Sequence, residues 1–95
     1  MTEQLEKSKY FLSLVMMLAS AAWQQLGKVP HPISGKTEKD LKSAQITIDI
    51  LVMLKEKTKS NISSDEEKAL ANVISDLELN YADEINKNEP PKPVN

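Results

Sequence analysis

The sequence contains no cysteine and no arginine, and it has only two glycines and one histidine among its 95 residues. Without cysteine the chain forms neither a disulfide nor a thiolate metal site, which fits a reducing compartment, and we expect a cytoplasmic protein. Without arginine it lacks the planar fork that binds phosphate through two hydrogen bonds, so nucleic-acid binding is not expected. Two glycines do not make a glycine-rich phosphate loop. We therefore expect no enzymatic activity and no cofactor.

Apolar residues recur at helical spacing along most of the chain, which disfavours strands. This periodicity predicts an all-α domain of three helices at about residues 4–26, 38–57 and 64–86. A chain of this length forms one domain with a small core, which we assign to residues 1–86. The polar, proline-rich residues 87–95 have nothing to bury and are expected to form a disordered tail.

Turn and capping residues separate these segments. Gly27 suits the left-handed position that ends a helix. Thr37 followed by Glu38 predicts the start of the second helix, because a hydroxyl and an acid satisfy the free amides of a first turn. Ser63 with Glu66 forms a second capping box and predicts the start of the third helix.

The first two helices are apolar around most of their circumference. On a helical wheel with about 100° per residue, the polar residues of the first helix form one narrow stripe: Lys9, Ser13, Ser20 and Gln24. Those of the second helix form a similar strip: Lys42, Gln45, Asp49 and Glu56. A helix that is apolar nearly all round must be buried nearly all round, and so small a chain cannot cover two such helices.

We therefore predict that the first two helices are largely buried by self-association, in a homo-oligomer that is at least a dimer. Trp23 suits an aromatic anchor in such an interface and suits the chain's own core equally well. The expected interface consists of apolar side chains from both helices: Leu12, Met16, Ala19, Trp23, Ile46, Ile50 and Met53.

Residues 10–27 carry no charge and reach the lower length limit of a membrane span. Ser13, Ser20 and Gln24 argue against that interpretation. The preceding residues include Glu3 and Glu6, whereas a signal peptide has net positive charge there. We expect no membrane insertion.

The third helix has one clean apolar stripe, which predicts that it covers the core from outside. The charges also differ along the chain: residues 1–60 hold nine lysines and six acids, whereas residues 61–95 hold three lysines and eight acids. The two halves could attract each other within or between chains, but a solvated surface explains the same counts. The stripe consists of Leu70, Val73, Ile74, Leu77, Tyr81 and Ile85.

Few polar residues suggest chemistry. His31 stands between two prolines and is expected to be an exposed loop side chain, because a lone histidine cannot hold a metal. Asp49 falls on the polar strip of the second helix, so we expect a solvated carboxylate. If the chain were an enzyme, His31 and Asp49 would have to lie in one site with Lys57, Thr58 and Asn61. The spacing of these residues in the sequence does not require that they come together.

Two functions remain. The leading hypothesis is a noncatalytic homo-oligomeric interaction or scaffold protein, with an unidentified protein partner left open. The alternative is a small-molecule or lipid binder with an apolar cavity between subunits, in which Met16, Met17, Met53 and Trp23 contact the ligand. A co-purifying molecule would separate the two.

Part of the sequence resembles a known family. The segment 48–54, continued by Glu56, Lys57, Thr58, Asn61, Ile62, Ser63, Asp65 and Glu66, is similar to a small bacterial family known as domain of unknown function number eighteen forty-four. The segments around Gly27 and Phe11 resemble it too, so that the resemblance covers about residues 8–81. It implies a compact, mostly helical, cytoplasmic bacterial protein and no activity, ligand or catalytic residue.

The chain departs from that family at Ser60, where the family tends to have glycine before the asparagine. We expect strain or a changed path at this exit from the second helix. Asn61 is the residue that we expect to visit the left-handed region.

Overall fold

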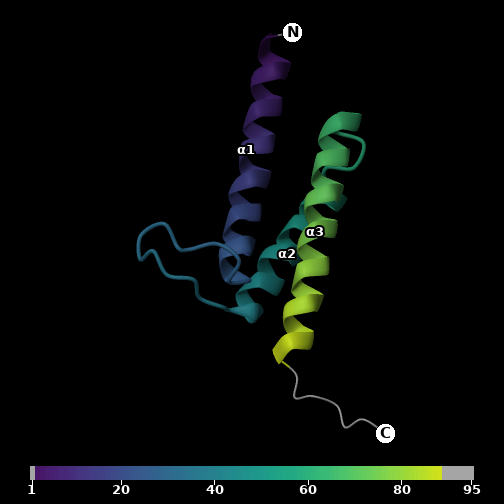
Figure 1. The fold of residues 1–95 in the computed structure, drawn as a ribbon. Coiled ribbons are helices and arrows are strands. Elements are labelled where there is room, and N and C mark those ends of the chain that lie inside the picture. Colours follow the sequence, from purple (N-terminus) through teal and green to yellow (C-terminus); the bar gives the residue numbers. More distant parts are fainter. Residues whose placement is uncertain (1, 89–95) are drawn as a thin grey trace, which may run out of the picture.

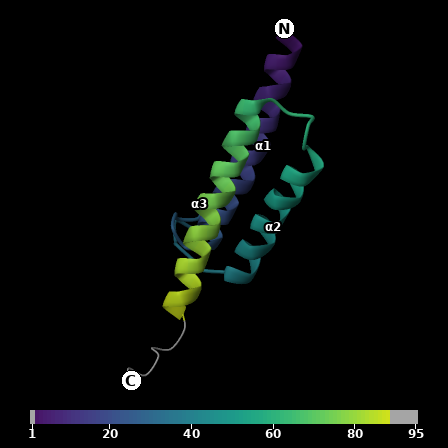
Figure 2. The ribbon, with the colours of Figure 1, turned by 90° about the vertical axis from the view of Figure 1, so that its right-hand side faces the viewer.

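The computed structural model describes residues 2–88 and consists of three helices: α1 (Thr2–Gln25), α2 (Leu41–Lys57) and α3 (Ser64–Asn88). Each helix packs against the other two, and α1 and α3 are the long ones (Figures 1 and 2). Among the described residues, strand-like pairing is limited to one isolated bridge between Leu26 and Lys39. The predicted all-α three-helix fold is confirmed.

Two predicted boundaries need correction. α2 begins at Leu41, and its cap is Asp40, whose carboxylate accepts the backbone amide of Ser43 at 3.1 Å and the Ser43 hydroxyl at 2.7 Å. These bonds lower the pKa of Asp40, the side-chain bond more than the backbone one. Thr37 is not the cap, because the bridge at Lys39 and the bond from the Asp40 amide to the Gln25 carbonyl (2.7 Å) keep the preceding residues out of the helix.

The second corrected boundary is the end of α3. This helix continues to Asn88, so it includes the first two residues of the predicted tail. Residues 89–95 lie outside the described residues.

Gly27 ends α1 as predicted. Its φ of 78° is left-handed, its amide donates to the Gln24 carbonyl at 2.9 Å, and the Lys28 amide donates to the Trp23 carbonyl at 3.0 Å. These two bonds make a Schellman motif. A Cβ atom at this position would also lie 2.8 Å from Cγ of Lys39, so both backbone conformation and space require glycine.

The predicted capping box at the start of α3 is confirmed. The Glu66 amide donates to the Ser63 hydroxyl oxygen at 3.1 Å, and the Ser63 amide donates to the Glu66 carboxylate at 2.9 Å. The second bond is the main reason that the pKa of Glu66 is lowered.

Ser60, and not Asn61, takes the left-handed conformation between α2 and α3, with φ of 71°. This is the position at which the resembling family tends to have glycine. A side chain is strained in this region, so the strain lies at Ser60, where it was expected, whereas the expectation of a left-handed Asn61 was wrong.

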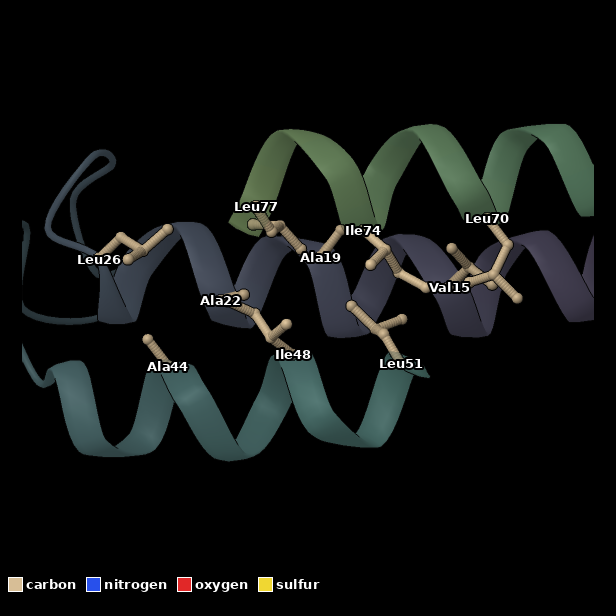
Figure 3. Packing of buried hydrophobic residues seen from close by; sticks show 10 residues of the cluster. All are labelled: Val15, Ala19, Ala22, Leu26, Ala44, Ile48, Leu51, Leu70, Ile74 and Leu77. Carbon is tan, nitrogen blue, oxygen red and sulfur yellow. The ribbon is translucent and has the colours of Figure 1, made fainter. Parts of the chain in front are cut away.

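The core lies between the three helices, and α1 contributes buried side chains that face both α2 and α3 (Figure 3). Ala19 faces Leu77 of α3, whereas Ala22 faces Ile48 of α2 (Figure 3). These small side chains allow both neighbours to approach α1 closely. The buried apolar residues are Val15, Ala19, Ala22, Leu26, Ala44, Ile48, Leu51, Leu70, Ile74 and Leu77.

Candidate functional site

One side of α1 is left uncovered by the other two helices. Its core residues recur at helical spacing and face α2 and α3, so the residues half a turn away face outward. Met17 is 66% exposed, Met16 58% and Tyr10 71%. A shallow hollow, lined by α1 residues alone, runs along this side. We call it the α1 outer face: Tyr10, Ser13, Met16, Met17, Ser20, Ala21 and Gln24.

The loop from Gly27 to Asp40 projects from the end of α1 away from α2 and α3, toward the side of the α1 outer face (Figures 1 and 2). Ile33, near its tip, is 91% exposed. The tip is nevertheless ordered: Nδ1 of His31 accepts hydrogen bonds from the backbone amides of Ile33 (3.1 Å) and Ser34 (3.4 Å). The His31 amide in turn donates to the Lys36 carbonyl at 2.8 Å. His31 is an exposed loop residue, as predicted, and it shapes the loop.

Glu84 holds the base of this loop against α3. Its carboxylate lies 2.7 Å from Nζ of Lys39, 3.1 Å from Nζ of Lys28 and 3.1 Å from Nζ of Lys87. The three lysines cover the Glu84 side chain, which is only 3% exposed. Their hydrogen bonds, that from Lys39 first, lower its pKa to about 2.

Sequence reasoning missed Glu84, although a signal was present. Glu84 comes seven residues after Leu77, and so it occupies a place in the apolar stripe of α3. Its partners Lys28 and Lys39 belong to the basic half of the chain. At this point the attraction between the two halves acts within one chain.

The predicted interface residues of α1 do not all lie on the α1 outer face. Ala19 is buried in the chain's own core, and Leu12 and Trp23 are half-buried. Trp23 packs against the core cluster. Met16 alone of the predicted α1 set is exposed. The reason is that α3 covers the edge of α1 on which Ala19 lies (Figure 3).

The predicted interface residues of α2 are all exposed, but they form a separate surface. Ile46, Ile50 and Met53 lie on the side of α2 opposite its buried residues. Charged residues interrupt this side, among them the exposed Asp49. Asp49 is therefore a surface carboxylate, as expected.

The polar residues considered for catalysis do not gather. His31 precedes α2, whereas Thr58 and Asn61 follow its other end, and a helix of 17 residues is about 25 Å long. The Thr58 hydroxyl donates to the Leu54 carbonyl of its own helix at 2.8 Å. Lys57 is exposed at the end of α2. Within residues 2–88 no three metal-binding side chains lie close enough to hold an ion.

Residues 8–83 match the sequence model of a family described as Domain of unknown function (DUF1844). The chain belongs to this family. The resemblance seen in the sequence is thereby confirmed, over nearly the same residues. No curated protein and no solved structure matches the chain. In the part of the chain that the structure describes, no helix has the length and apolar character to cross a membrane.

Proposed function

We propose that this protein is a noncatalytic, cytoplasmic bacterial module that associates with copies of itself through its exposed apolar helix faces. The observation that carries the proposal is the α1 outer face. Residues 10–27 contain no charged side chain, and Tyr10, Met16 and Met17 on this face are mostly exposed. The face also carries Ser13, Ser20 and Gln24, so its exposed apolar side chains lie among uncharged polar ones. Exposed apolar side chains with polar residues around them are typical of interaction sites.

The composition of the face suits association. Methionine and tyrosine are enriched at protein interfaces, and methionine adapts its shape to a partner. Because the face has no charged group, burying it leaves no unpaired charge. A closed twofold dimer is the commonest way for identical chains to bury one surface.

Light scattering behind size exclusion, with the full chain at micromolar concentration, tests the proposal. We expect a dimer or a larger assembly. Met17→Glu should raise the dissociation constant by at least about tenfold, because it places an unpaired charge in a desolvated contact. A monomeric unmodified protein would overturn the proposal.

Leu79→Glu on α3 is the matched control. Leu79 is 70% exposed and Met17 is 66% exposed, so neither substitution removes a core side chain. We expect Leu79→Glu to leave association unchanged. Native mass spectrometry of the same samples would show a bound small molecule, which would favour an apolar binding cavity between subunits instead.

A further inference from the structure

The loop of residues 28–39 contributes no side chain to the core. All of its residues are exposed, and its two apolar side chains other than proline, Val29 and Ile33, are 39% and 91% exposed. The loop projects away from the helices (Figure 1). A segment that buries no apolar side chain gains no hydrophobic stabilisation, so other contacts must fix its position.

Within itself the loop is ordered. Pro30 and Pro32 each have a fixed backbone φ angle. Between them, the His31 amide donates to the Lys36 carbonyl at 2.8 Å, and the Gly35 amide donates to the His31 carbonyl at 2.8 Å. Because these bonds join loop residues to each other, the loop can move as one body without breaking them.

Backbone contacts close the base of the loop. The Asp40 amide donates to the Gln25 carbonyl at 2.7 Å, beside the bridge between Leu26 and Lys39. These contacts join the two ends of the loop to each other. Gly27 lies at this base with φ of 78°, and a glycine has the backbone freedom that a hinge requires.

Glu84 joins this base to α3. Its Oε1 lies 2.7 Å from Nζ of Lys39 and its Oε2 lies 3.1 Å from Nζ of Lys28, so one carboxylate binds both ends of the loop. Lys87, which also pairs with Asp83 at 3.2 Å, lies 3.1 Å from the same Oε2. Without the charge of Glu84, three ammonium groups would face one another, and their repulsion would favour separation of the loop from α3.

We propose that residues 28–39 move as one rigid body about Gly27 and that the ion pairs of Glu84 hold this loop closed against α3. When the ion pairs are lost, the loop opens while the three helices stay packed, because the loop buries no core side chain. The ion pairs therefore decide in which direction the exposed Ile33 is presented. This inference is independent of the proposed self-association.

The lysines are the part of this cluster through which the loop opens. Hydrogen bonds from Lys39, Lys87 and Lys28 lower the pKa of Glu84 to about 2, so its carboxylate stays ionised in mild acid and the ion pairs persist. The side chains of Lys39 and Lys28 are 43% and 30% exposed, so both are accessible from solvent. Loss of their charges is the change that we expect to open the loop at neutral pH.

Distances between spin labels test the proposal, because the natural chain has no cysteine that would take up a label. The full chain carries Ile33→Cys in the loop and Leu79→Cys on α3, both at exposed positions. An excess of unlabelled chain removes distances between copies. We expect a narrow distribution of distances, and adding Glu84→Gln should widen it at least about twofold, because an open loop samples many orientations.

Further variants separate the ion pairs from a general effect of charge. Lys28→Gln and Lys39→Gln, combined in one chain, should widen the distribution as much as Glu84→Gln does. Asp83→Asn removes the neighbouring acid of α3, and Lys36→Gln removes a lysine from the loop itself. Both are matched controls and should leave the distribution narrow.

A second pair of labels reports on the helices. Met53→Cys on α2 and Leu79→Cys on α3 are both exposed and should keep one narrow distribution in every variant. If this pair also widens with Glu84→Gln, Glu84 holds the helices together and the proposal is overturned. It is overturned as well if the loop distribution stays narrow in both the Glu84 and the double lysine variants, or if it is already wide in the natural chain.

Discussion

α1 and α3 are nearly equal in length, 24 and 25 residues, and each has one side covered by the other two helices. Their outer sides differ. From Tyr10 to its end α1 carries no charged residue, whereas α3 carries charged residues at 65–68 and again at 76–87. Leu79 is the one large exposed apolar side chain of α3 among the described residues. The charged side chains of α3 are Asp65, Glu66, Glu67, Lys68, Asp76, Glu78, Asp83, Glu84 and Lys87.

The comparison shows that similar packing within the chain leaves two different requirements outside it. Water and neighbouring charges satisfy the outer side of α3, because its charged side chains are hydrated or paired with each other, as Lys87 is with Asp83. The α1 outer face has Met16 and Met17 where α3 has acids and lysines. Water is a poor solvent for these two apolar methionine side chains. Only α1 is therefore expected to need a second covering surface.

The largest effect on stability is expected from a substitution on the inner side of α3, compared with one on its outer side. Leu77 is fully buried and Leu79 is 70% exposed, two residues further along the same helix. Leu77→Ala should lower the free energy of unfolding by about 2 to 5 kcal/mol, since it leaves a cavity. Leu79→Ala should change it by less than about 0.5 kcal/mol. Urea denaturation measures both, and equal losses would contradict the observed packing.

The start of α3 provides the next test. Ser63→Ala removes the hydroxyl that accepts the Glu66 amide, and it should cost about 0.5 to 2 kcal/mol of stability. Ser64→Ala, one residue further, is the control and should cost less. Thermal or urea melts compare the two variants, and an unchanged Ser63→Ala would show that this cap contributes nothing.

In the turn that leads into α3, a substitution is expected to stabilise the protein. Ser60→Gly relieves a side chain held at φ of 71° and should stabilise the protein by about 1 kcal/mol. Asn61→Gly, at the position where we had expected the left-handed residue, should destabilise it slightly, because it adds only flexibility to the unfolded chain. The denaturation midpoints of the two variants show which of the two positions is strained.

The smallest effect concerns the contact between α3 and the end of α1. The pKa of Glu84 is lowered from 4.5 to about 2, so its ion pairs stabilise the folded chain above pH 4.5 and are lost as the pH falls toward 2. Glu84→Gln should therefore be less stable than the natural chain at pH 7, and the difference should shrink between these values. The partly exposed lysine ends limit its size.

Urea melts of both proteins at several pH values measure this difference. Asp40 and Glu66 also have lowered pKa values and lose stabilising bonds in acid, but they do so in both proteins. A constant difference from pH 7 to pH 2.5 would mean that Glu84 does not act through its charge.

Sequence by itself determined the features that depend on neighbouring residues. The glycine that ends α1 and the capping box of Ser63 and Glu66 were predictable because their hydrogen bonds join residues a few positions apart. The start of α2 was misplaced because the cap at Asp40 depends on pairing between Lys39 and Leu26, which are distant in the sequence.

Only the tertiary structure decided which apolar residues of α1 are covered. The polar stripe of Ser13, Ser20 and Gln24 marks the outer side in the sequence, but it does not show which of the apolar residues beside it a neighbouring helix covers. Ala19 was predicted in an interface between chains and is instead buried against α3, while Met17 was left exposed. The contacts of Glu84 with Lys28 and Lys39 likewise join residues that no local pattern connects, so they arise only when the three helices are packed.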